Sequence, residues 1–303
     1  MIANLTEPQR GHLAMLGFSA LVAGSFSLGG MSAGFIEPEV LNAVRFVVAG
    51  AVMALAAWLS GGMSRSVWVA PWRYFVLAGL FVFYFVTMFE GLKTAEPVSM
   101  AAVFTLNPAL SAMFGYVLIR QITTARMALA IVIGGIGALW VIFRGDPDLA
   151  MRFEIGHGEM IYFWGCIAHA LYAPLVRVFS RGEPALAFTA GVLVAGALIL
   201  CLWAGPGLVA ADWANMPNIV WVTIFYTAIA ATGLTFLAVR YAALRLPAAK
   251  VMAYTYLVPS WVILWELAMG RTVPTAMVLP GVALTVLALV MLLKDEEPQV
   301  ASA

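Results

Sequence analysis

Ten apolar segments, each about as long as a bilayer is thick, divide this chain of 303 residues. We place them at 12–33, 39–59, 72–92, 97–119, 124–143, 157–178, 184–204, 217–240, 247–269 and 273–293. Each is close to the roughly 20 residues that an α-helix needs to cross the hydrocarbon core. Because lipid cannot satisfy backbone polar groups, a spanning segment of this length must form its own hydrogen bonds as a helix. The sequence therefore predicts an all-α integral membrane protein with ten transmembrane helices in a lipid bilayer.

The composition supports this class and excludes others. The chain is 63% hydrophobic and 10% charged, whereas a soluble domain is about 45–50% apolar and about 25% charged. A net charge of +1 gives no electrostatic basis for binding nucleic acid. Cys166 and Cys201 both lie in apolar segments, where they predict neither a disulfide nor a metal site. The chain has no HExxH motif and no phosphate-binding loop, so we expect neither enzymatic activity nor a cofactor.

Two of the segments match each other around a central proline. The fourth segment, AEPVSMAAVFTLNPALSAMFGYVLIRQ, has prolines at 97 and 108 and an arginine at 120. The ninth, RLPAAKVMAYTYLVPSWVILWELAMGR, has prolines at 247 and 259 and an arginine at 271. Because five spans per half is an odd number, duplicated halves must insert in opposite orientations. We predict a 5+5 inverted repeat, with one half at residues 1–150 and the other at residues 151–303.

The central prolines, Pro108 and Pro259, are expected to kink their helices. A proline inside a helix removes one backbone hydrogen bond and clashes with the carbonyl four residues earlier. The carbonyls left free here are those of Phe104 and Thr255. Free carbonyls persist at membrane depth only against protein or a water-filled cavity. Paired broken helices in corresponding halves indicate a transporter's binding site, although many kinks are purely structural.

The residues around these prolines resemble a known family. Residues 243–250 (ALRLPAAK) and 256–259 (YLVP) are similar to the span-eight to span-nine signature of EamA-type members of the drug/metabolite transporter superfamily. Further similar stretches are 91–95 (GLKTA), 106–108 (LNP), 170–172 (ALY), 176–177 (VR) and 180–182 (SRG). The resemblance covers nearly the whole chain and implies a 5+5 inverted-repeat carrier of small organic metabolites, similar in layout to YddG-type amino-acid exporters. The chain departs from the family at Arg120-Gln121 and Arg271-Thr272, where a glutamate often follows the span.

Polar side chains inside the spans are the candidate substrate ligands. His169 lies near the centre of the sixth span, with Cys166 and Tyr172 on the same face. An ionisable group at this depth is costly and usually functional, although a neutral histidine can also simply bond a neighbouring helix. We predict that the substrate-binding residues, none of which requires a metal, are Ser25, Tyr84, Asn107, His169, Tyr172 and Tyr254. For Asn107 and the lone hydroxyls, the alternative is bridging between helices.

Other charged residues near the spans have simpler explanations. Arg45 lies about two turns into the second span, where Glu39 and Asn42 are the expected partners. Glu90 with Lys93, and Glu266 with Arg271, are expected to form ion pairs near the membrane interface. Lys250 is one turn into the ninth span and is expected to extend its amine towards water, with a role in the site as the alternative.

The distribution of basic residues predicts the orientation. If the N-terminus is cytoplasmic, eleven lysines and arginines lie at or beyond the inner ends of the spans and four at the outer face, leaving out Arg45 inside the second span. Basic residues accumulate on the cytoplasmic side. We therefore expect both termini to be cytoplasmic in a bacterial-type inner membrane.

These observations predict a secondary transporter that works by alternating access. Its substrates are expected to be amino acids or similar small metabolites, and it is expected to act as an exporter or facilitated exchanger. No carboxylate lies near the middle of a span, which favours exchange over tight proton coupling. The alternatives are an exporter of drugs or lipophilic cations and, in another class, a polytopic membrane enzyme. The sequence leaves the oligomeric state open.

Overall fold

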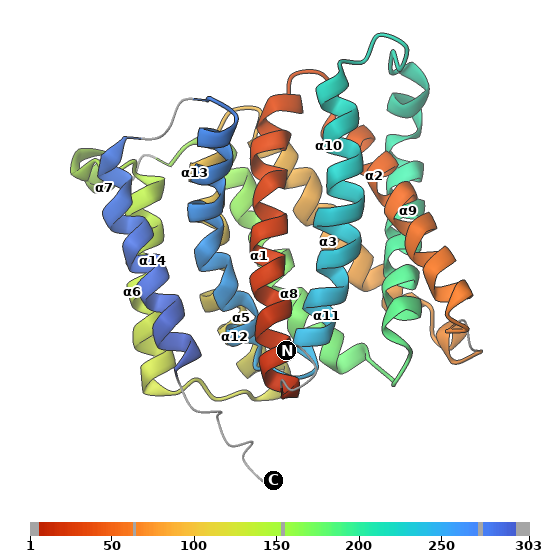
Figure 1. Cartoon of the computed structure of the whole chain (residues 1–303), viewed down its shortest axis with the longest axis horizontal. Coiled ribbons are helices and arrows are strands. Elements are labelled where there is room, and N and C mark those ends of the chain that lie inside the picture. Colours follow the sequence, from red (N-terminus) through yellow and green to blue (C-terminus); the bar gives the residue numbers. More distant parts are fainter. Residues whose placement is uncertain (1–5, 63–64, 153–154, 272–274, 295–303) are drawn as a thin grey trace.

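The computed structural model describes residues 6–62, 65–152, 155–271 and 275–294. Within these residues all regular secondary structure is helical (Figure 1). The α-helices are α1 (Glu7–Ser32), α2 (Pro38–Leu59), α3 (Trp72–Gly91), α4 (Pro97–Phe104), α5 (Asn107–Ile119), α6 (Ala125–Ile142), α7 (Pro147–Arg152), α8 (His157–Phe179), α9 (Ala185–Ala210), α10 (Asn218–Ala228), α11 (Thr235–Ala243), α12 (Ala248–Ala253), α13 (Val258–Ala268) and α14 (Leu279–Leu293). Short 3₁₀ turns are η2 (Arg65–Trp68), η4 (Tyr254–Leu257) and η5 (Ala276–Val278), and η3 (Ile229–Leu234) is a π-helical turn.

Ten helical segments of the described chain are long and apolar enough to cross a membrane. Their bounds agree with the predicted spans to within a few residues, except that the seventh continues to Ala210. The predicted fold class is therefore confirmed: an all-α membrane protein whose ten spans fall into two halves of five. Residues 153–154 of the loop between the halves, and Thr272, lie outside the described residues.

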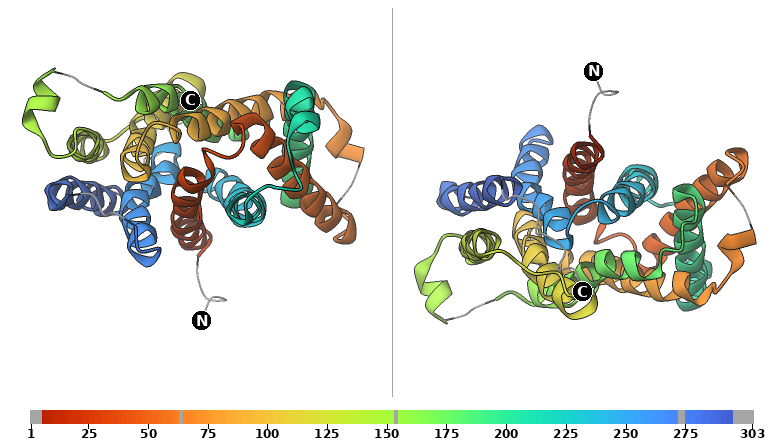
Figure 2. Two further views of the ribbon diagram at one scale, coloured as in Figure 1. Left: turned by 90° about the horizontal axis from the view of Figure 1, so that it is seen from above. Right: turned by 90° about the horizontal axis from the view of Figure 1, so that it is seen from below.

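The helices pack in long pairs that join the two halves. The most extensive pairs are α2 with α9, α6 with α14 and α3 with α8. The α6–α14 pair and the α2–α9 pair lie at opposite sides of the molecule, and α1 lies between them (Figures 1 and 2). We call the end of the bundle where α1 begins and α14 ends the terminal end, and the other end the opposite end. Each pair combines one helix from each half, so the halves share one continuous core.

Glycines allow the closest approaches between these helices. A Cβ atom on Gly158 of α8 would lie 2.3 Å from the carbonyl oxygen of Gly91 in α3. Likewise, a Cβ atom on Gly137 of α6 would lie 2.6 Å from the carbonyl oxygen of Gly281 in α14. No side chain fits at such distances. Small residues let backbones approach in membranes, where helix association relies on close packing rather than on the hydrophobic effect.

The fourth and ninth spans are interrupted just before their central prolines. Helix α4 ends at Phe104 and α5 begins at Asn107, which places Pro108 in the first turn of α5. In the ninth span the 3₁₀ turn η4 separates α12 from α13, and Pro259 lies in the first turn of α13. A proline is tolerated in a first turn because the backbone N–H that it lacks has no intrahelical partner there.

The expectation that two carbonyls are free at these breaks is wrong. The carbonyl of Phe104 accepts a hydrogen bond of 2.8 Å from Nδ2 of Asn107. The carbonyl of Thr255 accepts one from the backbone N–H of Val258. A 3₁₀ turn or a nearby side-chain amide can replace the missing helical donor, and the proline spacing does not reveal either.

The structure also contains a helix irregularity without a proline. The π-helical turn η3 lies between α10 and α11, against Arg45 of α2. Nε of Arg45 donates to Oγ1 of Thr232 at 2.6 Å, and Nη2 donates to the carbonyl of Ala231 at 3.2 Å. Asn42 is a partner as expected, with Oδ1 at 3.4 Å from Nη1. The expected pairing with Glu39 is absent from the described contacts, because backbone and hydroxyl oxygens of η3 take up the guanidinium instead.

Candidate substrate-binding site

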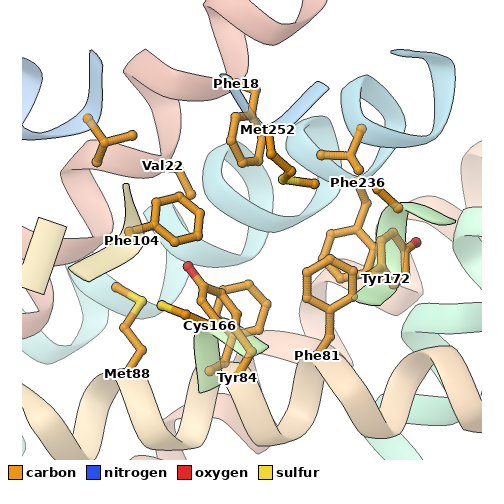
Figure 3. Close-up of a cluster of buried hydrophobic side chains, with 14 of the residues drawn as sticks. Phe18, Val22, Phe81, Tyr84, Met88, Phe104, Cys166, Tyr172, Phe236 and Met252 are labelled. Atoms are coloured by element: carbon orange, nitrogen blue, oxygen red, sulfur yellow. The ribbon is translucent and has the colours of Figure 1, made fainter. Parts of the chain in front are cut away.

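A cluster of aromatic rings surrounds His169 at the centre of the molecule. The ring of His169 lies 4.5 Å from that of Tyr84, 4.9 Å from Phe104 and 5.4 Å from Phe81, measured between centroids. Figure 3 shows that Phe18, Phe236 and Met252 close the same cluster from other helices. Helices α1, α3, α4, α8, α11 and α12 therefore all contribute, and they come from both halves of the chain.

Asn107 and His169 form the polar centre of this cluster. Nδ1 of His169 is 3.2 Å from Oδ1 of Asn107. The Asn107 amide orientation follows from its second bond, because Nδ2 must face the carbonyl of Phe104, which only accepts. Oδ1 of Asn107 can likewise only accept, so Nδ1 of His169 is assigned the proton. The neutral imidazole then keeps Nε2 as an unprotonated acceptor.

A pair of tyrosines adds hydroxyl groups to the cluster. The hydroxyl of Tyr162 donates to the hydroxyl of Tyr84 at 3.0 Å. Sequence reasoning missed Tyr162, although it lies four residues before Cys166 and seven before His169, on the same face of α8. The signal was present in the sequence, because Tyr162 lies one helical turn before Cys166 on the face that carries His169.

The structure brings together four of the six predicted ligands. Tyr84, Asn107 and His169 are in contact, and the ring of Tyr172 lies 4.1 Å from that of Phe81. The hydroxyl of Ser25 is buried in α1 and has no partner among the described residues. Tyr254 lies elsewhere, with its ring 6.0 Å from that of His12 in the first turns of α1.

The candidate site is buried within the bundle in this structure. His169 is 2% exposed, and the aromatic residues that contact it are equally buried. At the opposite end, Lys93 forms ion pairs with Glu37 at 2.7 Å and Glu90 at 2.9 Å. Partial burial alone would lower the pKa of Lys93, but the hydrogen bonds to these two carboxylates outweigh it and raise that pKa. The predicted pairs Glu90–Lys93 and Glu266–Arg271 are both present, the second at 3.4 Å.

At the terminal end a fully buried ion pair joins the halves. Nη2 of Arg73, at the start of α3, is 2.7 Å from Oε1 of Glu183, between α8 and α9. Both side chains are at most 1% exposed. Desolvation would raise the pKa of Glu183, but the backbone N–H of Arg181 and the Arg73 guanidinium outweigh it, so that pKa lies below its usual value. Glu183 therefore carries its charge at neutral pH.

Ten spanning helices in two inverted halves, with a buried and mostly apolar candidate site between them, are typical of membrane transport proteins of the inverted-repeat type. The chain belongs to the EamA-like transporter family, whose model matches residues 9–143 and, a second time, residues 157–294. This is the family that the sequence resembles around its two prolines.

Individual relatives agree with this assignment. The chain is 28% identical to "Uncharacterized transporter YyaM" of Bacillus subtilis (strain 168) over 273 residues, which covers 89% of this chain and 90% of the relative. It is 35% identical to "Aromatic amino acid exporter YddG" of Ancylobacter novellus over 108 residues, which covers 35% of this chain and 37% of the relative. A solved crystal structure without a functional description has the same fold, with a TM-score of 0.71 at 22% identity over 94% of this chain and 96% of the other.

Proposed function

We propose that the protein is a secondary transporter of amino acids or similar small metabolites, acting as an exporter or facilitated exchanger. The observation that carries this proposal is the buried aromatic cluster with the Asn107–His169 pair at its centre, next to the break between α4 and α5. Small-molecule sites are mostly apolar and have a few fixed polar groups that orient the ligand. The relative that matches 108 residues of this chain is named an exporter of aromatic amino acids, a substrate class that fits the same cluster.

The site offers complementary groups for the parts of such a substrate. The rings of Phe81, Tyr84 and Phe104 would pack against an apolar or aromatic side chain. Nε2 of His169, an acceptor, would accept a hydrogen bond from a substrate ammonium group. Because the site residues are buried, release requires the proposed halves 1–150 and 151–303 to move apart at one end at a time.

The described residues give no support to the enzymatic alternative. They contain no group of three or more His, Cys, Asp or Glu side chains that could hold a metal. Residues 30–34 match the pattern G-x-S-x-G, but Ser32 is the last residue of α1, and its hydroxyl donates to the carbonyl of Gly29 at 3.1 Å. A nucleophile elbow needs a turn from a strand into a helix, which α1 does not provide.

Counterflow of radiolabelled L-phenylalanine or another amino acid in proteoliposomes is expected to occur without a pH gradient. The physical reason is that no carboxylate contacts His169 in the described part of the chain, so the site lacks an acidic proton carrier. The measurement is counterflow with and without a protonophore. Collapse of transport with protonophore, together with a pH response abolished by His169→Gln, would make His169 a proton carrier. If no compound in a panel of amino acids and metabolites showed counterflow, the proposed function would be contradicted.

We also propose that both termini face the cytoplasm of a bacterial-type inner membrane. A cysteine at Ser60, in a variant without Cys201, is then expected to react only with reagents that enter the cell. A cysteine at Asn215, between α9 and α10, should react with impermeant maleimide in intact cells. The reverse labelling pattern would overturn the orientation derived from the basic residues.

A further inference from the structure

Arg240 places a buried positive charge next to the candidate site. It lies one helical turn after Phe236 on α11, on the terminal side of the aromatic cluster. The ring of Phe236 is 4.0 Å from that of Phe81 and 5.9 Å from that of Tyr172. Figure 3 shows the hydroxyl of Tyr172 directed away from the centre of the cluster. The side chain of Arg240 is only 2% exposed.

The hydrogen-bonding capacity of Arg240 is largely unused. Nη2 donates to the backbone carbonyl of Glu183 at 2.6 Å, and the guanidinium carbon lies 3.9 Å from the ring centroid of Phe188. Nε and Nη1 have no acceptor among the described residues. The hydroxyl of Tyr74 also lacks a partner there, and the Tyr74 ring lies edge-on to the same Phe188 ring at 5.5 Å. Two buried polar side chains with unmet hydrogen bonds therefore flank Phe188.

The nearby carboxylate is already engaged. Oε1 of Glu183 pairs with Arg73 at 2.7 Å, and Oε2 accepts from the backbone N–H of Arg181 at 2.8 Å. The carboxylate of Glu183 is thus bonded to Arg73, whereas the second buried guanidinium, that of Arg240, contacts only the backbone carbonyl of this residue. The half-buried guanidinium of Arg177 donates only to the backbone carbonyls of Ala243 and Leu246 in the described contacts. An unmet buried donor is costly, and a buried cation needs a counter-charge, so this region is suited to an anion.

We propose that Arg240 and Tyr74 form an anion subsite that binds the carboxylate of the transported substrate. This inference rests on the proposed function and names the chemical group that the site selects. A guanidinium and a hydroxyl donate to carboxylate oxygens, and the aromatic cluster one turn away receives the substrate's side chain. The excess positive charge disfavours an amine that lacks the carboxylate. A phosphate group shares the chemistry of this subsite, so the experiment includes it as a competitor.

The test compares L-phenylalanine with phenethylamine and L-phenylalaninamide, which lack the carboxylate. Thermal stabilisation of the purified protein and inhibition of counterflow are both measured. Wild type is expected to prefer phenylalanine by about tenfold or more, as for a hydrogen bond to a charged group. Arg240→Gln should lose this preference, with little change for phenethylamine. Without ligand, the unfolding temperature of Arg240→Gln should be no lower than that of wild type, because the substitution removes a buried charge with unmet hydrogen bonds. If Arg240 only stabilised the fold, the variant would unfold at a lower temperature.

Two further variants keep the proposal open to refutation. Tyr74→Phe removes a hydroxyl that has no partner, so it should fold normally and still weaken phenylalanine binding, even if Arg240→Gln does not fold. Arg126→Gln, on the exposed start of α6, is the control that should keep the preference. Full carboxylate preference in both Arg240→Gln and Tyr74→Phe overturns the subsite. So does binding at Arg240 by inorganic phosphate but not by phenylalanine. Absent counterflow in wild type would refute the proposed function, whereas thermal stabilisation tests the subsite independently.

Discussion

Pro108→Ala is expected to weaken substrate affinity about ten- to hundredfold while the protein still folds. The new backbone N–H at position 108 can donate to the carbonyl of Phe104, four residues earlier. That carbonyl now accepts from Nδ2 of Asn107, which fixes the amide that holds His169. The restored helical bond would displace the Asn107 amide and release the imidazole. The measurement is the concentration dependence of counterflow, alongside thermal unfolding.

A double variant tests whether Pro108→Ala weakens affinity through the amide of Asn107. Asn107→Ala should cause a similar loss, and adding Pro108→Ala to it should cause little more, because both act through one amide. Pro38→Ala is the matched control: it changes a proline in the first turn of α2 and keeps the carbonyl that accepts from Asn42. Additive losses in the double variant would show that Pro108 acts through something other than Asn107.

Glu183→Gln is expected to destabilise the protein by about 3–5 kcal/mol, because it leaves Arg73 buried without its counter-charge. Glu37→Gln breaks an ion pair of the same length, 2.7 Å, in which the glutamate is 65% exposed. The control variant Glu37→Gln should lower the free energy of unfolding by about 1 kcal/mol or less. Chemical unfolding in detergent measures both. Equal losses in the two variants would show that burial does not set the strength of the Arg73–Glu183 pair.

The same pair predicts a pH dependence of stability. The pKa of Glu183 is lower in the folded protein than its usual value. Its contribution is therefore fully present above the unfolded pKa and is lost as the pH falls through the folded pKa. Acidification below about pH 4 should destabilise wild type more than Glu183→Gln.

Reasoning from sequence located the helix breaks but not their hydrogen bonds. The two central prolines lie in the first turns of α5 and α13, each directly after an interruption of its span. The same prolines also led to the prediction of free carbonyls, which the structure shows bonded to Asn107 and to the backbone of Val258. The π-turn η3 carries no proline, so it gave no comparable signal.

The candidate site was predictable only where one helix carries several of its residues. His169 and Tyr172 share a face of α8, and that periodicity is visible in the sequence. The pairing of Asn107 with His169 joins residues 62 positions apart, and that of Arg73 with Glu183 joins residues 110 apart. The prolines align Asn107 with Val258 in the repeat. Tyr254, predicted on the same face as Val258, lies beside His12 instead.

The sequence by itself determined the class of protein, the ten spans and the positions of the two proline breaks. These depend on the length of apolar runs in lipid and on the covalent geometry of proline, and both act within a single segment. Only the tertiary structure decided which side chains complete each break, which tyrosines meet at His169 and which arginine is left with unused donors. Such partnerships depend on how helices from the two halves cross and rotate against each other. Those packing angles are set by contacts such as Gly91 with Gly158, which no single segment encodes.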